Sequence, residues 1–188
     1  MLVELRFHGR GGQGAVTAAN ILASAAVLEG LYAQAFPYFG AERRGAPVEA
    51  YARISDRPIE RHSQVREPDV VVVLDPEIPK IVDVARGLKP GGKIVFNSPS
   101  APLNSEELAA RSWCVNATRI ARELGLVVSG WPVVNTAMLG ALVKATGILS
   151  LDSVVKAIKD YFKGKGRLGE LNAEAAVEAY KQAAPCPH

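Results

Sequence analysis

Near the N-terminus, a glycine-rich turn lies between a short apolar segment and an alanine-rich segment. Residues 1–7 alternate well enough for a first strand, and residues 15–29 have the composition of a helix. Gly9, Gly11 and Gly14 fit the spacing G-x-G-x-x-G. A strand, a tight glycine turn and a helix in this order are typical of the start of a Rossmann-like unit, in which the helix N-terminus favours an anion. This stretch therefore predicts an α/β fold.

The second strand does not complete a dinucleotide site. Such a site usually carries an acidic residue at the end of the second strand, about 20 residues after the turn. That strand is predicted over residues 31–36, and no acid stands at its end, where Gln34, Phe36, Pro37 and Tyr38 occur. We therefore disfavour NAD. The glycines have two open interpretations: contact with a phosphate, or a tight turn that lets the helix pack closely on the sheet.

The next segment carries two adjacent arginines. Residues 36–48 contain Pro and Gly without helical or strand periodicity, which predicts a loop. Arg43 and Arg44 could hold a phosphate or carboxylate through forked hydrogen bonds. The alternative is that they form surface ion pairs, for example with Glu42.

The rest of the chain predicts more strands and helices. Residues 48–54 alternate like a half-buried strand, and the apolar run 70–74 is typical of a central parallel strand, with another strand at 93–97. Helices are expected over 79–87, 116–124, 133–147, 151–162 and 172–183. Together these elements predict a Rossmann-like open sheet, largely parallel, with flanking helices and a helical C-terminal part. Asn172 is expected to cap the last helix, and Gly140 to let another element approach closely.

Polar residues follow two of the predicted strands. Asp75 ends one strand, and Asn97 and Ser98 end another. Ligands of open α/β sheets bind at the carboxyl ends of the strands, so these residues lie where a ligand could bind. They are also ordinary capping residues.

Length and composition limit the classes of protein. With 188 residues, of which 48% are hydrophobic, the chain can form one domain, expected over residues 1–184, followed by a frayed tail at 185–188. The net charge of +3 without a basic run argues against a nucleic-acid binder. No signal peptide is apparent and no apolar run reaches a membrane span, so a cytoplasmic protein is expected, without a membrane partner.

Catalytic and metal-binding patterns are missing from the sequence. The two cysteines, Cys114 and Cys186, are too few for an iron–sulfur cluster, and no disulfide between them is expected because nothing suggests export. The histidines His8, His62 and His188 are scattered without metal-ligand spacing. This composition predicts a subunit of a larger assembly, with no catalytic residue of its own.

Three segments together resemble a known family. They are His-Gly-Arg-Gly-Gly-Gln-Gly at 8–14, Phe-Gly-Ala-Glu-Arg-Arg-Gly-Ala-Pro-Val at 39–48, and Asn-Thr-Ala-Met-Leu-Gly-Ala at 135–141. The combination resembles the gamma subunit of 2-oxoacid:ferredoxin oxidoreductases, the pyruvate synthase family, over nearly the whole chain. The Glu-Arg-Arg-Gly-Ala-Pro form is more similar to the pyruvate-type branch than to the oxoglutarate or indolepyruvate branch.

The resemblance implies activity within a complex, and no activity of the chain alone. Enzymes of this family decarboxylate a 2-oxoacid on thiamine diphosphate, pass electrons through iron–sulfur clusters to ferredoxin, and transfer the acyl group to coenzyme A. The resemblance implies alpha, beta and delta-type subunits as partners, and it assigns thiamine diphosphate and the clusters to them. Pyruvate is the first choice of substrate, and the alternatives are a branched-chain 2-oxoacid, phenylglyoxylate or oxalate.

The resemblance also implies that the gamma unit packs beside the active site and closes over coenzyme A. As a hypothesis, the coenzyme A or active-site face of this chain consists of Gly11, Gly12, Gln13, Gly14, Arg43 and Arg44. Two alternatives stay open: a purely structural subunit, and an NADP-binding reductase in which Arg43 or Arg44 holds the 2′-phosphate.

Overall fold

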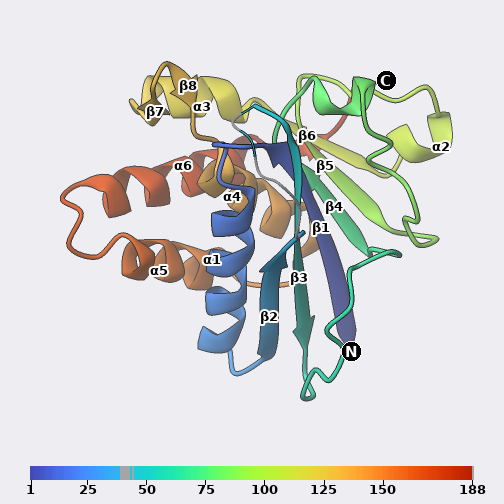
Figure 1. Ribbon diagram of the computed structural model, residues 1–188. Coiled ribbons are helices and arrows are strands. Elements are labelled where there is room, and N and C mark those ends of the chain that lie inside the picture. Colours follow the sequence, from blue (N-terminus) through green and yellow to red (C-terminus); the bar gives the residue numbers. More distant parts are fainter. Residues whose placement is uncertain (39–42, 44, 188) are drawn as a thin grey trace.

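A seven-stranded sheet forms the centre of the computed structural model, which describes residues 1–38, 43 and 45–187 (Figure 1). Its order is β2-β3-β1-β4-β5-β6-β9. The strands are β1 (Leu2–Arg10), β2 (Tyr32–Pro37), β3 (Pro47–Ser55), β4 (Val70–Val73), β5 (Lys93–Asn97), β6 (Ser112–Val115) and β9 (Ala184–Pro185), and β7 (Val127–Val128) and β8 (Trp131–Pro132) form a separate hairpin. The helices are α1 (Ala15–Leu28), α2 (Glu106–Ala109), α3 (Ala117–Glu123), α4 (Asn135–Thr146), α5 (Leu151–Tyr161) and α6 (Leu168–Gln182), with a short 3₁₀ helix η1 (Ile78–Lys80). Within these described ranges, no helix has the length and apolarity needed to span a membrane.

The predicted α/β class is confirmed, with a parallel centre made of β1, β4, β5 and β6. The edges differ from the Rossmann expectation. Strand β3 is antiparallel to both β1 and β2 and lies between them, so β2 does not pair with β1. The pairing of β3 with β1 is extensive, since it runs over nine consecutive positions, from Leu2↔Ser55 to Arg10↔Pro47. It occupies the edge of β1 that β2 would otherwise use.

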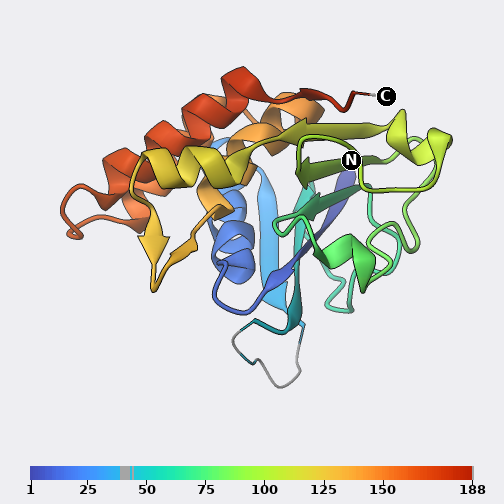
Figure 2. The same ribbon diagram turned by 90° about the horizontal axis from the view of Figure 1, so that it is seen from above.

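The two faces of the sheet are covered differently. Helices α1, α4, α5 and α6 lie together on one face, where the β1 side chains Leu5 and Phe7 join the main core (Figure 1). The opposite face is covered largely by loops, and there a smaller core cluster gathers around Val71, Ile94 and Phe96 (Figure 2). Functional residues at the ends of the strands can therefore lie either on the helical side or on the loop side.

Gly140 allows α4 and α6 to pack at very close range. A Cβ atom at this position would overlap the carbonyl oxygen of Ala176. Nearby, the buried Thr136 hydroxyl donates a hydrogen bond to Asn172 Oδ1 at 2.7 Å. The expected close approach at Gly140 is confirmed. The capping role of Asn172 is wrong, because α6 begins at Leu168 and Asn172 lies buried inside it.

The helix predicted over 79–87 is also wrong. Only the 3₁₀ turn of η1 forms there, and the chain continues through turns. The fully buried Arg6 side chain holds the end of this segment, since its Nη2 atom donates to the carbonyl oxygens of Val84 at 3.0 Å and of Arg86 at 2.6 Å. These bonds satisfy carbonyl groups of the turns and part of the buried guanidinium group.

The C-terminal segment is anchored by pairing and by a covalent bond. Strand β9 pairs with β6, Cys186 N donates to Ser112 O at 2.9 Å, and Cys114 and Cys186 form a disulfide. Fraying from residue 185 and two free thiols were both expected, and both expectations are wrong within the described range to 187. The compartment argument for free thiols could not anticipate that β9 brings Cys186 beside Cys114.

Candidate functional site

The glycine turn is bound directly to the end of the arginine-bearing loop. Gly11 N donates to Ala46 O at 2.9 Å, and Gly45 N donates to Gly11 O at 3.1 Å. Gly12 has a φ of +94°, a conformation that L side chains rarely adopt. The turn and the loop end therefore form one backbone unit at the carboxyl end of β1.

A polar network under the turn holds this unit in place. The Gln13 amide donates from Nε2 to Asp75 Oδ2 at 2.8 Å, and its Oε1 accepts from Arg10 N at 2.7 Å. Arg10 Nε lies 3.3 Å from Asp75 Oδ2, and Arg10 Nη1 donates to Gly45 O at 3.0 Å. Asp75 is almost fully buried, so its carboxylate needs hydrogen-bond donors inside the protein, and Gln13 and Arg10 supply them. The Gln13 side chain is therefore an internal support of the turn.

A pocket of about 440 Å³ opens between the turn and the β7–β8 hairpin. It is lined by Gly11, Gly12, Gln13, Gly45, Val128, Ser129 and Trp131. Ser129 and Gly130 both have positive φ, as a two-residue type I′ turn requires. This turn brings the half-exposed Trp131 indole to the pocket. The pocket thus combines backbone amides with an aromatic wall.

The pocket has the chemistry of an anion site. Helix α1 starts directly behind the turn, where first-turn N–H groups have no intrahelical partner and the N-cap residue Gly14 offers no side chain to accept from them. No acidic residue is among the described residues that line the pocket. A phosphate therefore fits here by donor type and meets no acidic side chain among these residues, and the indole could lie against a flat ring.

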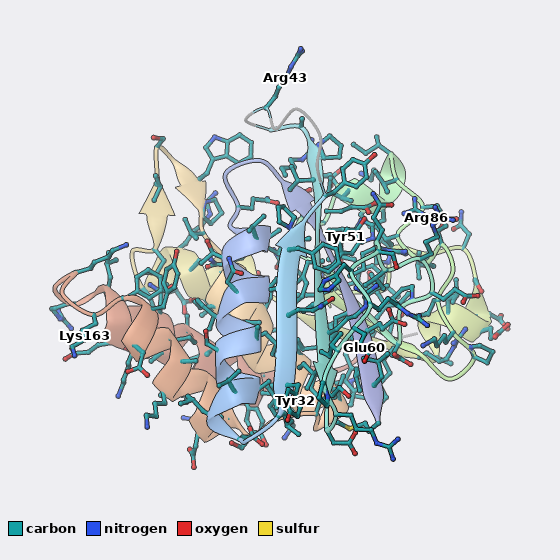
Figure 3. The ribbon with its side chains drawn as sticks, turned by 60° about the horizontal axis from the view of Figure 1, so that its bottom comes forward. Tyr32, Arg43, Tyr51, Glu60, Arg86 and Lys163 are labelled. Atoms are coloured by element: carbon teal, nitrogen blue, oxygen red, sulfur yellow. A yellow bond between two sulfur atoms is a disulfide. The ribbon has the colours of Figure 1, made fainter. Side chains whose placement is uncertain are left out.

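The structure separates the sequence-predicted site residues into three groups. Gly11, Gly12 and Gln13 line the pocket together. Gly14 lies behind it, where a Cβ atom would overlap the Asn135 side chain, so close packing explains this glycine. Arg43 is exposed and points away from the body of the protein (Figure 3). Arg44 lies outside the described residues.

Sequence reasoning missed the hairpin side of the pocket. Val128 and Trp131 come from a segment far along the chain, and only the Ser-Gly dipeptide between apolar residues signalled a hairpin there. The other strand-end candidates do not line this pocket. Asn97 donates to Leu74 O and Thr118 Oγ1, both at 2.9 Å, and it accepts from Ala117 N at the start of α3. Ser98 donates to the Ser100 carbonyl within its own turn.

A second polar cluster lies on the loop side of the sheet, around His8. His8 Nε2 accepts from Arg6 Nε at 2.8 Å. Glu49 accepts from the Tyr51 hydroxyl at 2.6 Å and from Arg86 Nη2 at 3.2 Å. Figure 3 shows Tyr51 and Arg86, which come from β3 and from the segment after η1. Burial and the Arg6 guanidinium lower the pKa of His8 to about 4, so His8 is neutral near pH 7.

The low pKa of His8 predicts an acid-dependent loss of stability. The unfolded state takes up a proton as the pH falls through about 6.5, whereas the folded state does so only near 4. Stability is therefore full above pH 6.5 and falls between 6.5 and 4, by up to about 3 kcal/mol. Urea unfolding across this range should show a smaller decrease in His8→Gln than in the wild type. The control is His62→Gln, at an exposed position, which should keep the wild-type dependence of stability on pH. If His8→Gln also kept the wild-type dependence, the assignment to His8 would be contradicted.

A family model and several known proteins match this chain. The model described as pyruvate ferredoxin/flavodoxin oxidoreductase matches residues 4–182. The pyruvate/ketoisovalerate oxidoreductases common subunit gamma of Thermococcus kodakarensis is 54% identical over 181 residues, covering 96% of this chain and 97% of that protein. Pyruvate synthase subunit PorC of Methanothermobacter thermautotrophicus is 52% identical, covering 96% of both chains.

A solved structure agrees with these relatives. The crystal structure of pyruvate oxidoreductase subunit PORC from Thermotoga maritima is similar with a TM-score of 0.78 and 35% sequence identity. The similarity covers 97% of each chain. The similarity therefore extends over nearly the whole chain.

Proposed function

The chain belongs to the pyruvate ferredoxin/flavodoxin oxidoreductase family, as one of its gamma subunits, and on this premise we propose that its complex oxidises pyruvate to an acyl-coenzyme A and that this chain supplies a face that closes over coenzyme A. In that complex, alpha, beta and delta-type subunits carry thiamine diphosphate and the iron–sulfur clusters, and ferredoxin receives the electrons. The complex is cytoplasmic in this proposal.

The observation that carries the coenzyme A proposal is the joined unit of glycine turn and arginine loop. Coenzyme A supplies the thiol that accepts the acyl group, and its phosphates are recognised through N–H donors and positive charge. The described pocket offers a backbone donor at Gly12, next to the start of α1, whereas the Gly11 N–H group already donates to Ala46 O. The hydrogen bonds between Gly11 and residues 45–46 hold the end of the arginine-bearing loop at this pocket, and in this proposal Arg43, which points away from the body of the chain, meets a phosphate of coenzyme A.

Specificity for the 2-oxoacid is proposed to lie largely in the other subunits. The Thermococcus relative is a common subunit of pyruvate and ketoisovalerate oxidoreductases, so by its name one gamma chain serves two substrates there. The PorC relative belongs to pyruvate synthase. Pyruvate is therefore our first proposal for this chain, and a branched-chain 2-oxoacid is the second.

Charge reversal of the loop tests the coenzyme A proposal. We expect the assembled complex with Arg43→Glu and Arg44→Glu to have a higher KM for coenzyme A and an unchanged KM for pyruvate, since only the phosphate-bearing substrate meets these side chains. The matched control is Arg57→Glu with Lys163→Glu, which changes the charge equally at exposed positions far from the loop (Figure 3 shows Lys163).

A further inference from the structure

A second cavity, of about 590 Å³, lies on the loop side of the sheet next to His8. Its volume falls within the range of about 300–1,000 Å³ that is typical of small-ligand sites. Val48, Val65, Ile78 and Val82 contribute apolar walls. Among the described residues, the cavity shares no lining residue with the pocket at the glycine turn, so its ligand is proposed independently of the role with coenzyme A.

The charges that line this cavity do not cancel. Glu49 is the carboxylate among the described lining residues, and the Tyr51 hydroxyl and Arg86 already occupy its two oxygens. Arg66 also lines the cavity, is exposed, and forms no ion pair within the described part of the chain. With His8 neutral, one positive charge remains in excess, and that excess matches a single anionic group.

The His8 imidazole lines the cavity, and one of its nitrogens has no hydrogen-bond partner among the described residues. Because His8 Nε2 accepts from Arg6 Nε, the imidazole proton is on Nδ1. His8 Nδ1 lies 3.8 Å from Glu49 Oε1, too far for a hydrogen bond, and it has no hydrogen bond to another of the described residues. The side chain is 1% exposed and lines the cavity. A buried N–H group normally has an acceptor, and His8 and Arg66 line the same cavity, so an anion in this cavity can accept from the imidazole N–H group.

We propose that this cavity binds a small monocarboxylic acid with a short aliphatic chain. The carboxylate accepts from His8 Nδ1 and pairs with Arg66, and the aliphatic chain packs against the apolar walls at Val48, Val65, Ile78 and Val82. An inorganic phosphate satisfies the positive charge but leaves these walls uncovered. An alcohol of the same shape covers the walls but leaves Arg66 unpaired.

Proton–nitrogen NMR of the full chain, with 2-methylpropanoate as the probe, tests this proposal. We expect saturable shifts of the His8 imidazole signals and of neighbouring backbone signals at millimolar concentrations. Inorganic phosphate and 2-methylpropan-1-ol, which each lack one half of the recognised chemistry, should bind at least about tenfold more weakly.

Two exposed arginines provide the matched variants. Arg66→Gln is expected to weaken binding of 2-methylpropanoate by about tenfold, the loss of one charge-assisted contact. Arg57→Gln, on the turn after β3, should leave binding unchanged. Three results would overturn the proposal: no saturable shift at His8, equal affinity for phosphate, or unchanged affinity in Arg66→Gln.

Discussion

Removal of the Cys114–Cys186 disulfide is expected to lower the free energy of unfolding by about 4 kcal/mol. The bond closes a loop with a sequence separation of 72 residues, and on the chain-entropy account its absence would let the unfolded state gain the freedom of that loop. Cys186 also packs in the smaller core cluster, and β9 pairs with β6 at only two positions. Urea unfolding of the oxidised protein and of Cys114→Ala with Cys186→Ala measures the difference.

The single variants provide the control for this effect. Cys114→Ala and Cys186→Ala each remove the same covalent bond, so each should cost nearly as much as the double variant, and the two losses should not add. Reduction of the wild type should have a comparable effect. A reduced protein as stable as the oxidised one would show that the C-terminal segment is held by its other contacts alone.

Gly140→Ala is expected to destabilise the fold by about 4 kcal/mol, which is near the upper end for a single substitution. A methyl group at this position overlaps the backbone of Ala176, so α4 and α6 must move apart, and backbone atoms cannot turn aside as a flexible side chain would. The greater helix propensity of alanine offsets only about 1 kcal/mol. Thermal and urea unfolding should both show the loss.

A second helical glycine separates packing from propensity. At Gly169 in α6, an added Cβ atom would meet its nearest neighbour, Lys159 Cα, at 3.6 Å, which is an ordinary contact. Gly169→Ala should therefore be neutral or slightly stabilising. If both substitutions changed stability alike, the close approach of α4 and α6 would not be the reason for Gly140.

Local signals predicted the first strand, the glycine turn and α1 in the correct order, and α1 to within one residue, but β1 continues through Gly9 to Arg10, three residues beyond the predicted end. The glycine spacing and the helix composition act within about 30 residues, and tertiary packing does not overrule them there. The insertion of β3 between β1 and β2, and the anchoring of Cys186 by β9, depend on pairing between distant segments. No local pattern specifies such pairing.

The buried polar face of the sheet was the least predictable part. Alternation along β3 places Arg53 on the polar side, and a half-buried strand would normally expose it to water. In the structure, loops cover this face, and Arg53 is fully buried with hydrogen bonds to Glu4, Gln34 and the 61–64 backbone. The same loops bury His8, and only the fold shows that the loops return over these strands.

At the candidate site, the sequence predicted the glycine side of the pocket and missed its hairpin wall. Gly11 was recognised by its spacing from Gly9 and Gly14, and Gly12 as a further glycine of the same turn, so both depended on one short segment. Trp131 reaches the pocket because the β7–β8 hairpin folds back between α3 and α4. A residue more than 100 positions from the glycine turn can be assigned to this pocket only from the three-dimensional structure.

The KM for coenzyme A of the complex carrying Arg43→Glu and Arg44→Glu tests the central claim most directly. Native mass spectrometry of the same sample establishes that the variant gamma chain is assembled with its partners. The account predicts a rise of at least about tenfold in this constant, with the KM for pyruvate and the Arg57→Glu with Lys163→Glu control unchanged. An unchanged constant in a fully assembled complex would contradict a role of this face in binding coenzyme A.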